Sequence, residues 1–183
     1  VSADAFAHLS VVLQAMSWQP IHDAAREGDV EKLKQLLKAK PEDVDLTTSG
    51  DWTPLMFAAI EGKLAAVKVL FEHKASVSKT NSSGGTALHA AGCRDYNEIV
   101  AFLLDHGADI NKQEGVGETV LMYAALRDNP KGVKLLLERK ADTTLRATDG
   151  QWRGKSALHI AKQMKADGNG YDEAIELLQF AST

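Results

Sequence analysis

The sequence predicts an all-α protein built from a row of similar helix pairs, and two recurring phrases with a nearly constant spacing carry this prediction. The phrase TPLMFAA at 53–59 has near-copies at 19–25, 86–92, 119–125 and 156–162, with steps of 34, 33, 33 and 37 residues. A second apolar phrase starts 14 residues after the opening position in each of the first four units, at Leu33, Val67, Val100 and Val133. Repetition at such a period indicates stacked supersecondary units.

The second unit shows why each phrase predicts a helix. Thr53 is a good N-cap, and Pro54 at the first helical position loses no hydrogen bond. Gly62 can adopt the left-handed conformation that ends a helix. The first helix is expected to pack through its apolar and small residues, and the second helix, roughly 64–73, through apolar residues at helical spacing. These packing residues are Leu55, Ala58 and Ala59, then Ala65, Val67, Leu70 and Phe71.

A third phrase, GADIN at 107–111, closes the unit, with weaker versions at 74–76 and 140–142. Together the three phrases resemble the ankyrin repeat over residues 17 to about 180. The resemblance implies a solenoid of stacked antiparallel helix pairs, with hairpin-like loops projecting at 44–52, 76–85, 109–118 and 142–155. We expect a single domain over 1–183, with repeats at about 17–48, 49–81, 82–114, 115–147 and 148–183.

The two ends of the array need their own explanation. Apolar residues at helical spacing predict an N-terminal capping helix within 1–16, although a docking helix or part of a truncated repeat is an alternative reading. The fifth unit carries about four extra residues within 146–155. Another four separate its helices, with 165–170 as the expected turn. Since terminal repeats shield the stack from water, we interpret this unit as a C-terminal cap.

Composition narrows the function. The chain has 25% charged and 44% hydrophobic residues, as folded proteins do, and no apolar run long enough to span a membrane. A net charge of −4 without a basic cluster argues against nucleic-acid binding. The single cysteine, Cys93, suits a reducing compartment, so the cytoplasm is expected, with the nucleus as the alternative. We expect a monomer.

No arrangement of residues predicts catalysis, a cofactor or a metal site. His22, His89 and His159 share one position of the opening phrase, where the family uses histidine to tie neighbouring repeats, and Met56 and Met122 replace it elsewhere. His89 and Cys93 are four residues apart, but no third partner for a catalytic or metal site can be named. The glycine-rich loops lack the Gly-Lys-Ser/Thr sequence of a phosphate-binding loop.

Asn111 has two readings. By resemblance, the asparagine of this closing phrase is a candidate acceptor for hydroxylation. The other reading is an ordinary turn-forming asparagine.

The resemblance also implies where a partner binds. The variable residues before each opening phrase and at the end of each first helix line a concave side, and several of them are tryptophan, arginine or large apolar residues typical of binding surfaces. The predicted partner-binding residues are Trp18, Trp52, Ile60, Glu61, Arg94, Glu118, Leu126, Arg127, Trp152 and Arg153. The predicted function is therefore a non-catalytic module for a protein or peptide partner. The alternative is a regulatory or substrate-recruiting segment of a larger enzyme whose catalytic domain lies outside this chain.

Overall fold

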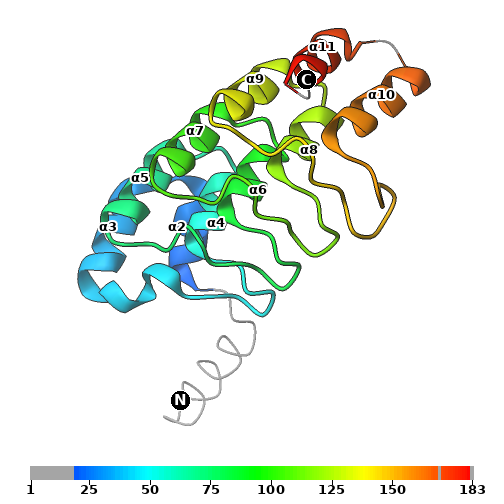
Figure 1. Cartoon of the computed structure of the whole chain (residues 1–183). Helices are drawn as coiled ribbons and strands as arrows, with labels where there is room; N and C mark the ends of the chain where they lie inside the picture. Colours follow the sequence, from blue (N-terminus) through cyan, green and yellow to red (C-terminus); the bar gives the residue numbers. More distant parts are fainter. Residues whose placement is uncertain (1–18, 169, 182–183) are drawn as a thin grey trace.

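A computed structural model describes residues 19–168 and 170–181, and these form stacked helix pairs from one end to the other (Figure 1). The first helices of the pairs are α2 (Pro20–Glu27), α4 (Pro54–Ile60), α6 (Ala87–Gly92), α8 (Val120–Leu126) and α10 (Ala157–Asp167). The second helices are α3 (Val30–Ala39), α5 (Leu64–Glu72), α7 (Asn97–Asp105), α9 (Pro130–Glu138) and α11 (Asp172–Phe180), and a short 3-10 helix, η1, spans Pro41–Asp45. The all-α prediction is confirmed, while the N-terminal helix and Trp18 lie outside the described residues.

The helices form two rows. Each first helix packs against the first helix of the next pair, as α4 does against α6, and the second helices form a parallel row behind them. Small residues permit this close approach: a Cβ added at Gly92 on α6 would lie 2.4 Å from Val120 Cγ2 on α8. One continuous apolar core runs between the rows.

The recurring phrases form the elements that they predict. The Thr53 hydroxyl accepts a hydrogen bond from the backbone N–H of Met56 at 3.3 Å, and Thr119 does the same for Met122 at 3.4 Å. A left-handed residue then separates the two helices in each of the first four pairs: Gly28, Gly62, Asp95 or Asp128. Glycine and aspartate tolerate this conformation, so the turn recurs although its residue changes.

Two details of the predicted helices are wrong. Ala65 on α5 is exposed, and Ala66 is buried in its place. In the fifth unit, α10 continues through Asp167, so part of the expected turn at 165–170 is helical. The extra residues lengthen the first helix, and Lys165 forms an ion pair with Asp172 at the start of α11.

Hairpin turns project from the ends of the first helices at 48–52, 81–85, 114–118 and 147–155 (Figure 1). In all four, the backbone N–H of the opening residue donates to the carbonyl of the closing one, as Asn81 does to Gly85 at 2.9 Å. Neighbouring turns are joined by backbone hydrogen bonds: Ser82 N–H to the Gly50 carbonyl at 3.0 Å, and Thr148 N–H to the Val116 carbonyl at 2.9 Å. These bonds hold the projecting wall in register.

His22 and His89 each connect the first helix of their own unit to the loop that leads into the next unit. The Nε2 of His89 lies 3.0 Å from the Lys112 carbonyl, so it donates, and Nδ1 then accepts from the Thr86 N–H and hydroxyl. His22 makes the corresponding bond to the Leu46 carbonyl at 2.9 Å. His159, in the last unit, is exposed and contacts the Ser156 hydroxyl instead. The histidines of the first and third repeats thus serve the scaffold.

We expect stability to fall as the pH drops below about 6.5, the ordinary pKa of histidine. Burial lowers the pKa of both His22 and His89, so the unfolded chain binds protons more readily than the folded one. Their stabilising contribution is complete above the unfolded pKa and is lost as the pH falls toward the folded one. Thermal unfolding at about pH 7.5 and about pH 5.5 checks this. The drop in melting temperature should be smaller in His89→Gln, and an unchanged drop in that variant would contradict the explanation.

Candidate functional site

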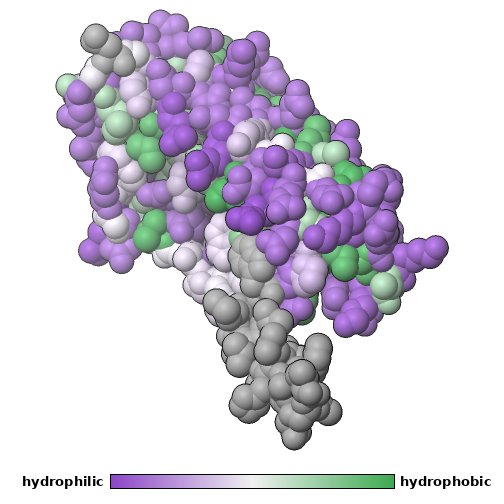
Figure 2. All heavy atoms as spheres, turned by 180° about the vertical axis from the view of Figure 1, so that it is seen from behind, coloured by the Kyte–Doolittle hydropathy of each residue, from purple (hydrophilic) through white to green (hydrophobic). Residues whose placement is uncertain are grey.

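Two adjoining hollows lie where the projecting turns meet the first helices. The central hollow, about 220 Å³, is lined by residues of the second, third and fourth units, among them Trp52, Met56, Cys93 and Tyr123. The second, which we call the N-terminal hollow, has about 500 Å³ and is lined by Arg26 and by residues around Trp52. On the face shown in Figure 2, hydrophilic side chains predominate and the hydrophobic ones form small separate patches. The two hollows are defined places where a partner could insert a side chain.

Trp52 and Ile60 line both hollows and form the ridge between them. Trp52 is half-buried, and its ring packs against Phe57 with centroids 5.3 Å apart. It closes the 48–52 turn, where its N–H is 3.3 Å from the Thr48 hydroxyl. Glu61, next to Ile60, is exposed and lines the N-terminal hollow. The structure thus brings three of the predicted residues together.

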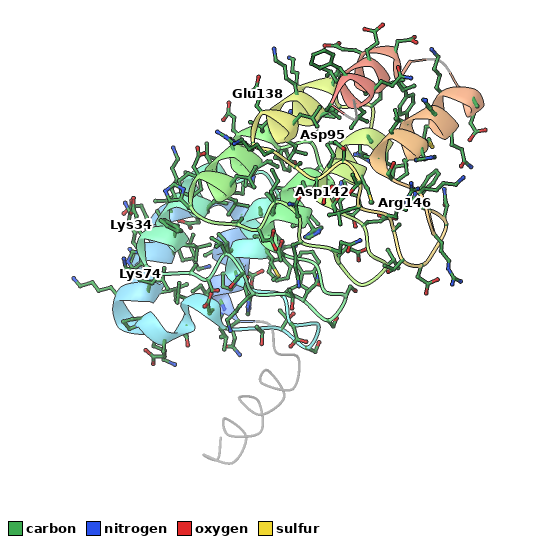
Figure 3. The ribbon with its side chains drawn as sticks, viewed as in Figure 1. Lys34, Lys74, Asp95, Glu138, Asp142 and Arg146 are labelled. Carbon is green, nitrogen blue, oxygen red and sulfur yellow. The ribbon has the colours of Figure 1, made fainter. Side chains whose placement is uncertain are left out.

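The predicted arginines differ from each other. Arg94 is exposed just beyond α6. Arg127 occupies the matching place after α8, and its Nε lies 3.6 Å from a carboxylate oxygen of Asp95 in the preceding unit (Figure 3 labels Asp95). Because both partners are well exposed, this pair contributes little stability, but it reduces the availability of Arg127 to a ligand.

Leu126 and Glu118 lie nearer the C-terminal end of the same surface. Leu126 is half-buried, and its carbonyl accepts the Tyr171 hydroxyl at 3.0 Å. Glu118 closes the 114–118 turn, and burial together with the nearby charge of Glu114 raises its pKa. The Glu114 carboxylate accepts from the N–H groups of Val116 and Glu118 at 3.1 and 3.3 Å. Two carboxylates are therefore held close together beside the central hollow.

The prediction of an exposed Trp152 is wrong. Its side chain is only 4% exposed and belongs to the apolar core, whereas the adjacent Arg153 is exposed. The longer 147–155 turn folds back on itself. The Lys155 N–H donates to the Trp152 carbonyl at 2.8 Å, and Arg146 Nη1 donates to the Gly154 carbonyl at 2.9 Å. The extra residues thus turn the Trp152 side chain inward, into the apolar core.

Tyr123 and Glu114 are not among the predicted partner-binding residues, although both line the central hollow. The position of Tyr123 in the repeat could have pointed to it, because it matches the positions of Phe57 and Ala90 in the two preceding repeats. Burial raises the pKa of the Tyr123 hydroxyl, which therefore remains protonated at neutral pH. It can serve as a hydrogen-bond donor at the edge of the hollow.

The His89 and Cys93 pair does not form a nucleophile. His89 Nδ1 is engaged by Thr86, and the Cys93 thiol lies 3.2 Å from the Ala90 carbonyl, to which it donates. Burial raises the pKa of Cys93, which disfavours the reactive thiolate. Within 19–168 and 170–181, no group of three or more His, Cys, Asp or Glu residues is arranged to hold a metal ion.

Asn111 lies on the exposed edge of the loop after α7. Its side-chain oxygen accepts the Asp142 N–H at 2.8 Å, and its own N–H donates to Asp109. This places it as a link between the third and fourth units, and its hydroxylation stays a prediction.

Known proteins resemble the chain in its repeats. The family description "Ankyrin repeats (3 copies)" matches residues 21–114, and "Ankyrin repeats (many copies)" matches 103–161. Over 86 residues the chain is 40% identical to the glycerophosphocholine phosphodiesterase gde1 of Schizosaccharomyces pombe, covering 46% of this chain and 7% of that protein. Over 78 residues it is 37% identical to the NAD-capped RNA hydrolase NUDT12 of Homo sapiens, covering 43% and 17%.

A third relative is smaller. Protein phosphatase 1 regulatory subunit 27 of Mus musculus is 30% identical over 77 residues, which is 42% of this chain and 50% of that protein. The matches thus span at most half the length of these relatives. Among the described residues, none of the helices is long and apolar enough to cross a membrane. Since one family match covers more than half of the chain and the helices stack as repeated pairs, this chain belongs to the ankyrin-repeat family.

Proposed function

We propose that the chain is a non-catalytic module that binds a protein or peptide partner along its turns and first helices. Ankyrin repeats are protein-interaction modules, and such domains are generally not catalytic. The observation that carries the more specific proposal is the ridge of Trp52 and Ile60 between two hollows. Half-buried aromatic residues on a rigid scaffold provide binding energy with little loss of conformational freedom.

Capture of partners from a cell extract tests this proposal. We expect Trp52→Ala combined with Arg94→Ala to lower recovery of the specific partner at least about tenfold, since such anchors dominate binding energy. The melting temperature should change little, because Trp52 is half-buried and Arg94 is exposed.

A matched control replaces two exposed lysines on the second helices, Lys68 on α5 and Lys134 on α9, with alanine. This variant should capture the partner as the wild type does. Undiminished capture by the Trp52 and Arg94 variant, or loss of its fold, would count against the proposed surface.

A second candidate function is the regulatory or substrate-recruiting segment of a larger enzyme. Two relatives whose names denote enzymes match this chain over only 7% and 17% of their lengths, so the matched segments are small parts of them. The transcript that encodes this chain decides between the readings. Codons for a catalytic domain beyond either end of the repeats favour the enzyme. A reading frame that encodes the repeats alone favours the free-standing module.

We also propose that the chain is monomeric, does not bind nucleic acid and resides in the cytoplasm. The single cysteine supports the cytoplasm, and the acidic net charge argues against nucleic-acid binding. Light scattering of the purified chain, filter binding at two salt concentrations and microscopy of a tagged chain test the three parts.

A further inference from the structure

The central hollow exists because the third repeat carries small side chains where its neighbours carry large ones. At three matched positions the second repeat has Trp52, Phe57 and Ile60, and the fourth repeat has Glu118, Tyr123 and Leu126. The third repeat has Gly85, Ala90 and Cys93 at those positions, and all three line the hollow. The missing side-chain volume leaves a gap in an otherwise filled row.

The size and lining of the gap suit one large apolar side chain. Its volume of about 220 Å³ exceeds the roughly 150 Å³ that can hold a benzene molecule. Met56 and Ile60 supply aliphatic surface on one side, and the Tyr123 ring stands on the other. Burying an aromatic or branched side chain there would remove apolar surface of both molecules from water.

The charge beside the hollow suits a cation. Glu114 lines it and Glu118 stands next to Glu114 in the same turn, and no ion pair among residues 19–168 and 170–181 involves either carboxylate. Burial raises the pKa of Glu118, and the nearby charge of Glu114 raises it further, as expected for a carboxyl group beside a like charge. A Lys or Arg from a partner would relieve this repulsion and form charge-assisted hydrogen bonds.

We propose that the central hollow binds a linear peptide segment of the partner that places one large apolar side chain in the gap and a neighbouring Lys or Arg against Glu114 and Glu118. This inference rests on the proposed function and defines the class of peptide. It assigns a specificity-determining role to the small residues Gly85, Ala90 and Cys93, and to the two carboxylates.

Selection from a phage-displayed random peptide library on the wild-type chain provides the probes. The selected peptides should share an apolar residue beside Lys or Arg. Cys93→Leu, which gives the third repeat a side chain like Ile60 or Leu126, should weaken their binding at least about tenfold, as expected for loss of an anchoring contact. Ala65→Leu on the exposed face of α5 is the matched control and should leave binding unchanged.

The charge requirement has its own pair of variants. Glu114→Gln combined with Glu118→Gln should remove the preference for Lys or Arg over Gln in synthetic versions of the selected peptides. Glu138→Gln on α9, labelled in Figure 3, should retain that preference. Thermal unfolding of each variant confirms that it remains folded.

Cys93 also reports occupancy, because it is the single cysteine of the chain and lines the hollow. Saturating selected peptide should slow its alkylation by iodoacetamide in the wild type. Peptides that lack the apolar and basic pair, bind Cys93→Leu normally or leave alkylation unchanged would overturn this inference while leaving the proposed function standing. Failure to select any peptide would count against both.

Discussion

Replacing Leu103 with alanine is expected to lower the free energy of unfolding by about 2 to 5 kcal/mol, the usual range for a large-to-small change in a packed core. Leu103 is fully buried in α7, in the middle of the array. Because α7 packs against both α5 and α9, the cavity would weaken two interfaces between repeats. Urea unfolding followed by circular dichroism measures the loss.

Leu104 provides the control, since it is the next residue of α7 and only half-buried. Leu104→Ala should lower the free energy of unfolding less than Leu103→Ala does. An equal effect, or a loss below about 1 kcal/mol for Leu103→Ala, would contradict the proposed packing.

Trp152→Ala is expected to be similarly damaging, with a loss of about 3 to 5 kcal/mol, because the indole is 4% exposed and its removal leaves a large cavity. Because Trp52 is half-buried, Trp52→Ala should lower the free energy of unfolding less than Trp152→Ala does. We expect Trp52→Ala to weaken partner binding more than Trp152→Ala does. Denaturant unfolding and partner capture, measured on both variants, separate the two roles. A stable Trp152→Ala chain that no longer captures its partner would restore the surface role that its burial argues against.

The sequence predicts the helix pairs well because the same capping and packing positions recur about every 33 residues. Thr53 and Thr119 cap helices as expected, and the second phrase supplies buried residues such as Leu70 and Leu103. The errors concern details that period alone does not determine. Ala65 and Ala66 are chemically identical, and only the rotation of α5 against its neighbours decides which one is buried.

The fifth unit was harder to predict for a similar reason. Its extra residues break the register, so neither the extension of α10 nor the inward turn of Trp152 follows from comparison with the other repeats. The turn at 147–155 depends on local contacts, such as the hydrogen bond that Arg146, the residue before it, donates to the Gly154 carbonyl. No recurring sequence phrase predicts such hydrogen bonds.

The candidate site was predicted in part. Trp52, Ile60 and Glu61, chosen by their position in the repeat, lie together at the N-terminal hollow, and their contact with a partner stays a prediction. The central hollow was missed because it arises from a difference between repeats, the small residues around Cys93 between larger neighbours. Aligning the repeats for size at each position, rather than for their shared phrases, would have pointed to it.

Hydrogen–deuterium exchange of the chain, free and bound to a captured partner, tests the binding surface most directly. We expect slower exchange in the turns at 48–52, 81–85 and 114–118 and in the first helices α4 and α6. Exchange in the second helices α5, α7 and α9 should change little. Protection centred on those second helices, or none in the turns, would contradict the claim that the chain binds its partner through the surface around Trp52.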